Sequence, residues 1–392
     1  MQLSRRIKSV TPSATLAVTA RARQMKAEGI DVVSFGAGEP DFDTPEFIKS
    51  AAKTALDAGD TKYTPKCGAE LKSAIVEKLK RENGINLKPE NIIPTFGGKQ
   101  ALFNAFQVLL NLGDKVLIPA PYWVSYPEQV KLAAGECLFI PTGPEKNFKI
   151  TPQDVLDHAG DAKILIINSP SNPTGATYTP EELQAIAEAV LKTDLIVFTD
   201  EIYEKLIYGD TRFVSFASLD DRLVERTLTF NGLAKTFSMT GWRIGWAAGP
   251  ADVIKAMASL GSHQTNSPPG FIQAGALAAY TNPAAAEAVE TMRQEFERRG
   301  RHMHQRLGAI EGVSCDEPTG AFYCFPDISA NYKKMKVSGS LEFAGVCLEQ
   351  AGVAVVPGIA FGEDRCVRLS FATSLEQIDK GIDRLEKMLK RI

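Results

Sequence analysis

The chain has 392 residues, of which 44% are hydrophobic and 23% are charged. This balance is typical of an ordinary globular protein and excludes collagen-like, coiled-coil and disordered chains. Asp and Glu outnumber Lys and Arg by 47 to 44, so the net charge is −3 and no strongly basic field is present to bind nucleic acid. The length predicts about two to three domains.

Neither the cysteines nor the histidines suggest a disulfide framework or a metal site. The four histidines have no metal-ligand spacing, and His302 and His304 are expected on a charged, solvated helix face. No signal-peptide core and no run of about 18 apolar residues occurs, which predicts a cytoplasmic protein without a membrane span. The six cysteines lack C-x-x-C spacing, and each is expected to be a small buried apolar residue: Cys67, Cys137, Cys315, Cys324, Cys347 and Cys366.

Short β-branched runs alternate with helical patterns in the central part of the chain. An amphipathic helix is predicted over 180–192, between two of these runs. Each run ends in polar residues or in Gly and Pro, and the predicted strands lie at 115–121, 163–170, 194–201 and 226–232. This alternation predicts an α/β fold with a mostly parallel sheet that helices cover on both faces.

The C-terminal part has a different pattern, which predicts a smaller α+β unit. A long charged amphipathic helix is expected over 285–310 and a final helix over 375–392. Between them the sequence predicts a strand within 321–328, a helix over 340–352 and short strands at 353–357 and 366–372.

Polar side chains follow the predicted strands, where ligands of parallel α/β sheets bind. Asp200 comes directly after the apolar run LIVFT. A buried carboxylate needs a cation or strong donors, so Asp200 either faces a protonated ring nitrogen or caps the next helix. Tyr203 lies three residues further on, within one helical turn of Asp200 if that segment is helical, and taken alone it could be a packed aromatic residue. Asn172, in SNPTGA, either places its amide in the crevice or only forms a turn.

Three basic residues lie in unusual surroundings. Lys235 follows a predicted strand among small and apolar residues, where a desolvated amine can form a Schiff base, although it could also extend to the solvent. Arg243 lies between two tryptophans in the sequence, and its guanidinium either binds a phosphate or stacks on a tryptophan ring. Arg368 lies in the strand-like CVRLSFA and either binds a carboxylate or pairs with a neighbouring acid.

The segment TFGGKQ (95–100) places two glycines and Lys99 at the start of an apolar helix. The free N–H groups and the dipole of such a helix end attract anions, although a glycine pair before a helix is a weak signal alone. GAGEP (36–40) lacks the third glycine of a nicotinamide-binding loop, and no P-loop, H-E-x-x-H or G-x-S-x-G motif occurs.

Together these residues supply what pyridoxal phosphate and an amino-acid substrate require: a lysine, an acid for the pyridine nitrogen, a phosphate site and an arginine for a carboxylate. The order of these residues along the chain resembles that in the class I aminotransferases of the aspartate aminotransferase family (fold type I). GLAKTFSMTGWRIG (232–245) fits the lysine motif of that family, and SNPTG, DEIY and VRLS follow in family order. The resemblance covers nearly the whole chain.

The resemblance implies a fold type I transferase, with a mostly parallel seven-stranded sheet in a large domain and a smaller α+β domain. The implied large, pyridoxal-phosphate-binding domain spans 45–285, and the small domain combines the N-terminal segment 1–44 with 286–392. Tyr63, in TKYTP, matches the tyrosine that reaches the phosphate of the neighbouring subunit, which implies a homodimer.

The resemblance also implies a role for each site residue. Lys235 would hold pyridoxal 5′-phosphate as an internal aldimine and move the proton between the substrate α-carbon and the cofactor C4′. Asp200 would keep the pyridine nitrogen protonated, while Asn172 and Tyr203 would bind the ring O3′. Trp123 would stack on the ring. The phosphate would be held by Gly98, Lys99 and Arg243. The substrate would contact Gly38, Lys99, Trp123, Asn172 and Arg368.

One position bears on the phosphate site, and three motifs bear on the subgroup. Gly232 stands where many relatives have a phosphate-binding serine, so one phosphate contact is missing or replaced. GGKQ, PYWVSYP and TGWRIG look like subgroup I-β, in which the lysine matching Lys99 binds the distal carboxylate of the substrate.

The leading hypothesis is therefore an aspartate aminotransferase that exchanges an amino group between L-aspartate and 2-oxoglutarate. Prephenate or aromatic amino acids are alternative substrates, with which Thr15 and Lys99 are compatible and Thr11 is less so. A pyridoxal-phosphate-dependent C–S lyase and a non-catalytic binding protein with the same fold are further alternatives.

Overall fold

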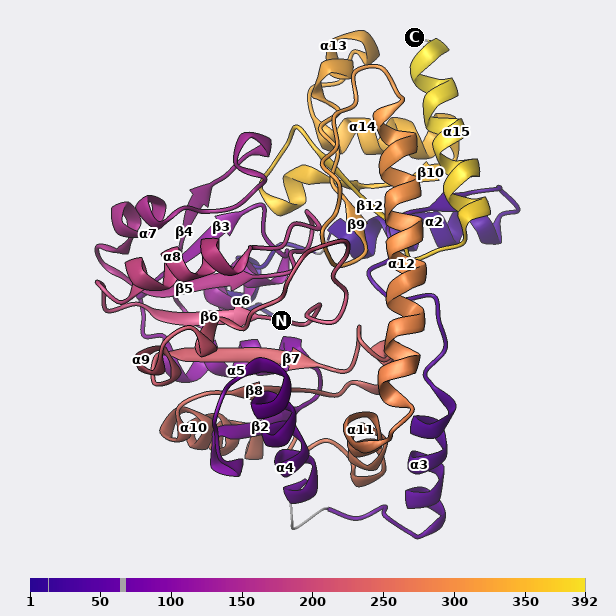
Figure 1. Cartoon of the computed structure of the whole chain (residues 1–392). Coiled ribbons are helices and arrows are strands. Elements are labelled where there is room, and N and C mark those ends of the chain that lie inside the picture. The colour runs from indigo at the N-terminus through magenta and orange to yellow at the C-terminus, as the bar shows by residue number, and fades with distance from the viewer. Residues whose placement is uncertain (13, 64–67, 392) are drawn as a thin grey trace.

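A computed structural model describes residues 1–12, 14–63 and 68–391 of the chain (Figure 1). Its largest sheet has seven strands: β2 (Ile92–Thr95), β3 (Lys115–Ala120), β4 (Glu136–Pro141), β5 (Ala162–Asn168), β6 (Ile196–Asp200), β7 (Thr227–Gly232) and β8 (Gly245–Ala248). Their order is β2-β8-β7-β6-β5-β3-β4. Strands β7, β6, β5, β3 and β4 pair in parallel, whereas β8 is antiparallel to both of its neighbours. The predicted mostly parallel sheet is confirmed.

The middle of strand β5 is apolar on both sides because helices cover both faces of this sheet. Ile164 and Ile166 of β5 pack with one layer of helices, and the alternating Leu165 and Ile167 pack with the other. The first layer contains α5 (Gly98–Leu109), α6 (Ser125–Leu132) and α10 (Ala251–Ser262), and the second contains α7 (Pro152–Ala159), α8 (Pro180–Val190) and α9 (Asp221–Val224). A further cluster joins α3 (Glu46–Asp57), α4 (Ala69–Lys78) and α11 (Gly270–Thr281) to β2 and β8.

The rest of the chain surrounds two small sheets. One is antiparallel, in the order β11 (Val356–Pro357), β12 (Val367–Ser370), β9 (Tyr323–Cys324), and the other pairs β1 (Val33–Ser34) in parallel with β10 (Val353–Ala354). The segment 353–357, expected as one strand, is thus divided between two sheets. The helices here are α12 (Ala285–Gly308), α13 (Tyr332–Met335), α14 (Ser340–Val346) and α15 (Leu375–Arg391).

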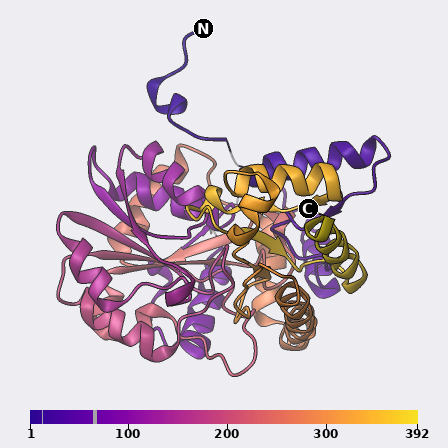
Figure 2. The same ribbon diagram turned by 90° about the horizontal axis from the view of Figure 1, so that it is seen from above.

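The N-terminal segment contributes α1 (Arg5–Lys8) and α2 (Ala14–Ala27). Figure 2 shows the N-terminus extending from the body of the molecule; α1 lies next to α6, and α2 lies against β10 and β11. Because β1 pairs with β10, the segment that follows α2 joins the C-terminal unit. The division of the chain at residues 44 and 285 remains a prediction.

Short turns of other helix types complete the structure, at Leu79–Asn83, Pro89–Asn91, Pro144–Lys146, Phe216–Ser218, Thr240–Trp242, Ser329–Asn331, Cys347–Ala351 and Gly358–Phe361. In the described part of the chain, no helix has the length and apolar character needed to cross a membrane. Nor do the described residues bring three or more His, Cys, Asp or Glu side chains together in a way that could hold a metal ion.

Candidate active site

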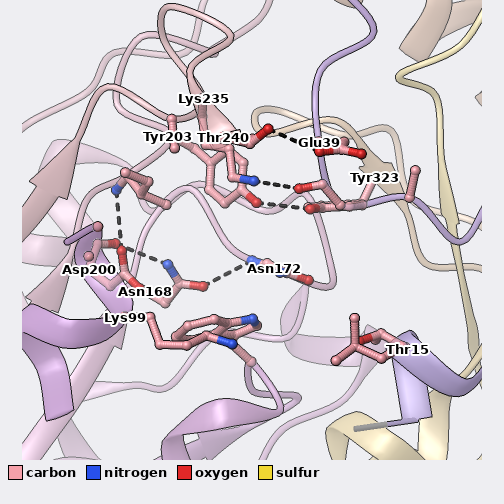
Figure 3. A pocket seen from close by; sticks show the side chains of 18 of the residues that line it. Thr15, Glu39, Lys99, Asn168, Asn172, Asp200, Tyr203, Lys235, Thr240 and Tyr323 are labelled. Carbon is pink, nitrogen blue, oxygen red and sulfur yellow. Dashed lines mark hydrogen bonds between the residues drawn. The ribbon is translucent and has the colours of Figure 1, made fainter. Parts of the chain in front are cut away.

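A cavity of about 670 Å³ lies at the carboxyl ends of the central strands (Figure 3). Asn168 and Asp200, the last residues of β5 and β6, line it together with Asn231 of β7. The start of α5 forms another wall, and α2, β9 and β12 contribute residues from the other part of the molecule. The cavity therefore lies where ligands of parallel α/β sheets bind.

The predicted site residues meet in this cavity, with one exception. Tyr63 does not line it, and its side chain is 86% exposed in this single chain. The predicted residues that do line the cavity are Gly38, Gly98, Lys99, Trp123, Asn172, Asp200, Tyr203, Lys235, Arg243 and Arg368.

Asp200 is a buried carboxylate with two donors. The Tyr126 hydroxyl donates to its Oδ2 at 2.7 Å, and the backbone N–H of Ile202 donates to Oδ1 at 3.3 Å. The side chain is 8% exposed, and burial raises its pKa to about 6 despite both hydrogen bonds. The Ile202 contact closes a turn, and the next helical segment begins only at Phe216, so Asp200 is not the helix cap that one interpretation expected. The burial favours a further, cationic partner on the cavity side.

Asn168 connects Asp200 with Asn172. Its Nδ2 donates to the backbone carbonyl of Asp200 at 3.0 Å, and its Oδ1 accepts the backbone N–H of Asn172 at 2.9 Å. One amide side chain therefore fixes the ends of two neighbouring segments, and the SNPTG turn places Asn172 in the cavity rather than on the surface.

Lys235 lies half-buried at the cavity, so it does not extend into the solvent. Its Nζ donates to the carbonyl of Gly38 and lies 6.0 Å from the ring centre of Tyr203 and 5.6 Å from that of Phe322. Burial lowers the pKa of this amine to about 8. An amine with this pKa is partly neutral near neutral pH and can act as a nucleophile or a base.

The start of α5 and Arg243 form a site suited to an anion. Gly97 precedes the helix with φ +85°, and a Cβ on it would lie 2.9 Å from Nη2 of Arg243. A Cβ on Gly245 would lie 2.5 Å from the backbone nitrogen of Gly98. Glycines at these positions let the guanidinium and β8 approach the helix end, where free N–H groups and the dipole attract a phosphate.

Lys99 and Trp123 lie together on another wall of the cavity. The Nζ of Lys99 is 4.9 Å from the ring centre of Trp123, which is a cation–π distance. Burial, and then the neighbouring charge of Arg243, lower the pKa of Lys99. Trp123 also meets Tyr126 edge-on, with 5.3 Å between the ring centres.

Arg368 is held by neutral partners. It is 2% exposed, and its guanidinium donates to Asn172 Oδ1 at 2.9 Å and to the Gly36 carbonyl at 3.1 Å. It also lies 4.4 Å from the ring centre of Tyr323. These partners leave the positive charge without a carboxylate, so Arg368 is suited to bind an acidic ligand in the cavity.

Tyr203 and Tyr323 are buried and share a hydrogen bond of 2.9 Å between their hydroxyl oxygens (Figure 3). Tyr203 follows β6 of the large sheet, and Tyr323 belongs to β9. Burial raises the pKa of both phenols, so both remain protonated near neutral pH.

The structure gives a reason for Gly232. A Cβ at this position would lie 2.8 Å from Cα of Gly245 and 3.1 Å from the carbonyl oxygen of Ile244. Both contacts are with backbone atoms at the start of β8 and just before it, which cannot rotate away as a side chain can. A serine therefore does not fit here unless β8 moves.

Sequence reasoning missed several residues of the cavity, chiefly Tyr126, Asn168, Tyr323, Glu39 and Thr240. Asn168 is the polar residue that ends the run ILIIN, so the argument used for Asp200 could have found it. Tyr126 and Tyr323 carry no comparable local signal, because their helix and strand reach the site only through the tertiary fold.

A comparison with protein families decides the assignment. The model described as "Aminotransferase class I and II" matches residues 30–385. The chain belongs to the class I and II aminotransferase family. The family predicted from the motifs is thereby confirmed, and so is the prediction of an enzyme.

Similar aminotransferases match along the whole chain. The aspartate aminotransferase of Bacillus subtilis (strain 168) is 48% identical over 393 residues, which covers 100% of both chains. The aspartate/prephenate aminotransferase of Cereibacter sphaeroides is 46% identical over 98% of each. A solved structure of the Thermus thermophilus aspartate aminotransferase with maleate shares 46% identity over 99% of each chain, with a TM-score of 0.93. This likeness confirms the predicted fold class.

Aminotransferases of this family are pyridoxal phosphate enzymes, and the donors of the cavity fit that cofactor. Two buried nitrogens, Nδ2 of Asn231 and Nε of Arg368, have no hydrogen-bond partner in the described structure. Both residues line the cavity, together with the amine of Lys235 and the carboxylate of Asp200. Such unsatisfied donors are expected where an acceptor-rich ligand completes the site.

Proposed function

We propose that this chain transfers an amino group reversibly between L-aspartate and 2-oxoglutarate, giving oxaloacetate and L-glutamate, with pyridoxal 5′-phosphate as cofactor. The observation that carries the proposal is that two cations, Lys99 and Arg368, line the same cavity as Lys235. A substrate with two carboxylates can engage both cations while its amino group faces the lysine. The names of the most similar relatives support the same activity.

The residues that would hold the cofactor come from both parts of the molecule. When bound, pyridoxal phosphate supplies an electron sink for the negative charge that develops at the substrate α-carbon. Lys235 would hold the cofactor covalently, and Asp200 would face its ring nitrogen. Asn172 and Tyr203 would bind O3′, and Trp123 would stack on the ring. The phosphate would be held by Gly98, by the backbone of Lys99 and by the Arg243 side chain.

Lys235 would be the catalytic base. Because its pKa is about 8, its Nζ has a neutral fraction near neutral pH that can take the proton from the substrate α-carbon and return it. Asp200 would keep the ring nitrogen protonated by accepting a hydrogen bond from its N–H, while the Tyr126 hydroxyl holds the carboxylate in place.

The substrate would be fixed at its two ends. Arg368 would bind the α-carboxylate with help from Asn172 and Trp123, and Gly38 would line the pocket. Lys99 would bind the distal carboxylate, which selects dicarboxylic substrates over apolar ones.

The proposed active unit is a homodimer in the cytoplasm. Tyr63 is exposed and lies outside the cavity of its own chain, as expected of a residue that reaches the phosphate of a neighbouring subunit. The pairing of β1 with β10 supports a small domain that combines 1–44 with 286–392, beside a large domain at 45–285.

Prephenate is the second candidate substrate, because several relatives at 45–46% identity are named aspartate/prephenate aminotransferases. Thr15 and Lys99 both line the cavity, whereas Thr11 lines a neighbouring cavity that Lys99 also lines. Initial rates with oxaloacetate and with prephenate, measured with glutamate as the amino donor, distinguish the two acceptors.

The visible spectrum of the purified protein tests the main proposal. Bound cofactor should give a yellow band that moves to the ultraviolet with L-aspartate and returns with 2-oxoglutarate. A band that ignores aspartate but responds to another amino acid would keep the cofactor and change the substrate. Absence of the band after adding pyridoxal phosphate would contradict both.

Two controls complete this experiment. Lys235→Ala should lose the band and the activity, whereas Lys149→Ala, which removes a lysine that does not line the cavity and pairs with Glu182, should keep both. Release of pyruvate from cystathionine without a keto-acid acceptor would instead favour a C–S lyase on the same fold.

A further inference from the structure

The segment 38–44, which we call the strap, lies beside the loop 233–243 that carries Lys235. This loop connects β7 with β8, and the pairing of Gly232 with Gly245 fixes its two ends. The residues between these ends belong to neither strand. Their position therefore depends on contacts with other parts of the fold, and the strap supplies several of them.

Three side-chain hydrogen bonds join the end of the strap to the middle of the loop. The Ser238 hydroxyl donates to the carbonyl of Phe42 at 2.7 Å, and the Thr44 hydroxyl donates to the carbonyl of Ser238 at 2.7 Å. Thr44 Oγ1 also accepts the indole N–H of Trp242 at 3.0 Å. The Thr44 hydroxyl is thus both a donor and an acceptor, and it holds the loop at two positions.

The start of the strap contacts the loop at the cavity (Figure 3). The Thr240 hydroxyl donates to Oε2 of Glu39 at 3.0 Å, and Nζ of Lys235 donates to the carbonyl of Gly38. The strap therefore meets the loop on both sides of Ser238, and one of its carbonyl groups binds the amine itself.

Ser238 has a backbone conformation that needs support from its surroundings. Its φ is +54°, which lies in the left-handed region that is costly for a residue with a side chain. Such a conformation persists where neighbouring contacts hold it. The hydroxyl and the carbonyl of Ser238 both bond to the strap. The strap thus stabilises a strained turn only three residues after Lys235.

The strap is itself anchored on α12. Nη1 of Arg299 lies 2.8 and 2.9 Å from the two carboxylate oxygens of Asp41, and the guanidinium lies 5.3 Å from the ring centre of Phe42. Phe42 also meets Phe296 edge-on, with 5.3 Å between the ring centres. Because α12 contacts both α11 and α15 (Figure 1), the strap connects the lysine loop with a helix that borders both parts of the molecule.

We propose that the strap positions the amine of Lys235 for the amino transfer proposed above, with Thr44 as its main positioning residue. The reaction rests on the proposed function, whereas the contacts between strap and loop do not. Thr44 does not line the cavity, so it acts through Ser238 and Trp242 rather than on a ligand. Without the Thr44 hydroxyl, both groups lose this partner, and the lysine should shift relative to the carbonyl of Gly38.

Two substitutions of Thr44 test the positioning. Thr44→Val keeps the shape of the side chain but removes the hydroxyl, whereas Thr44→Ser keeps the hydroxyl. We expect Thr44→Val to lower kcat for aspartate by about tenfold, with a change in KM of about twofold or less, because a displaced amine slows the reaction more than it weakens binding. The pH at which the yellow band of the bound cofactor changes should also move. Thr44→Ser should restore both.

Hydrogen–deuterium exchange tests the strap independently of the reaction. In the purified full chain, the backbone amides of the loop 233–243 should exchange several-fold faster in Thr44→Val than in the native chain, and those of β5 should not change. Thr151→Val is the matched control, because the Thr151 hydroxyl also donates and accepts, in its case with Asp154 at the start of α7. It should lower stability but change neither the loop nor the band.

Equal exchange of the loop in Thr44→Val and in the native chain would overturn the proposal. So would an unchanged kcat together with an unchanged titration of the band in that variant. A native chain that ignores aspartate would contradict the proposed function instead, and the exchange of the loop would still decide whether the strap holds it.

Discussion

Tyr203 and Tyr323 join the two parts of the molecule through one hydrogen bond of 2.9 Å between their hydroxyl groups. Tyr203 lies beside Lys235, and the ring of Tyr323 faces the guanidinium of Arg368 at 4.4 Å. The pair therefore connects the proposed O3′ contact with the proposed carboxylate site. Removing one hydroxyl tests this connection.

Tyr323→Phe should lower kcat/KM for aspartate by about tenfold, because the Tyr203 hydroxyl loses a buried partner, a loss of about 1 kcal/mol or more. The ring that faces Arg368 remains, so we expect a larger effect on kcat than on KM. The pH at which the band of the bound cofactor changes should also move, which a visible pH titration measures.

Tyr178→Phe is the matched control for this variant. The Tyr178 hydroxyl is buried and accepts the backbone N–H of Ile150 at 2.9 Å, and Tyr178 does not line the cavity. This change should lower stability but leave the spectral titration unchanged. Equal titrations in Tyr323→Phe and the native chain would refute the proposed connection.

Lys99→Ala should lower kcat/KM for aspartate by roughly 10- to 100-fold, because a hydrogen bond to a charged group contributes about 1.5–3 kcal/mol. L-Alanine, which lacks the distal carboxylate, should react at a rate close to that of the native protein. Lys149→Ala is the control, since Lys149 also lies over a tyrosine ring, at 5.7 Å, but outside the cavity. An unchanged rate with aspartate would mean that Lys99 does not select dicarboxylates.

Asp200→Asn should stabilise the cofactor-free protein near pH 7.5. The pKa of Asp200 is about 6 in the folded chain against 3.8 as the ordinary value, so its contribution to stability is fully present below pH 3.8 and is lost as the pH rises through 6. The difference amounts to about 3 kcal/mol above that range. Asparagine does not titrate and avoids this cost.

Urea unfolding of the cofactor-free protein measures this effect. The stability gain of Asp200→Asn at pH 7.5 should shrink towards pH 4, while the variant binds pyridoxal phosphate more weakly at every pH. A variant that is less stable than the native chain at pH 7.5 would show that burial of the ionised Asp200 carboxylate does not lower the stability of the protein.

Gly232→Ser should destabilise the protein by about 1–3 kcal/mol, which is typical of overpacking. The added Cβ would meet the β8 backbone 2.8 Å away at Gly245. We therefore expect no gain in phosphate binding from the added hydroxyl. Gly345→Ser is the control because a Cβ there meets nothing within 4 Å. Unfolding midpoints compare the two, and equal midpoints would contradict the clash.

Local patterns predicted the central strands and helices because burial on both faces imposes continuous apolar runs. The expected strand at 194–201 corresponds to β6 at Ile196–Asp200, and the expected helix at 180–192 corresponds to α8 at Pro180–Val190. The division of 353–357 between two sheets was not predictable, since the choice of partner strand depends on residues far away in the chain.

In the cavity, too, residues with a local sequence signal were predicted, and residues that only the tertiary fold brings there were not. Asp200 and Lys235 carry local signals, because a charge beside a buried strand is costly and therefore informative. Tyr126 and Tyr323 read as ordinary aromatic residues until the fold brings them to Asp200 and Tyr203. His304, which was expected on a charged and solvated helix face, is half-buried in α12, and its Nδ1 is buried without a partner in the described structure. Cys67 lies outside the described residues.

The pairing of β1 with β10 has a consequence for synthesis. Val33 and Ser34 emerge early from the ribosome but meet Val353 and Ala354 only when most of the chain has been translated. Arg368 follows even later. A nascent or truncated chain can therefore assemble the large sheet with Asp200 and Lys235 before it possesses the arginine proposed to bind substrate. The site is completed last, by the two ends of the polypeptide.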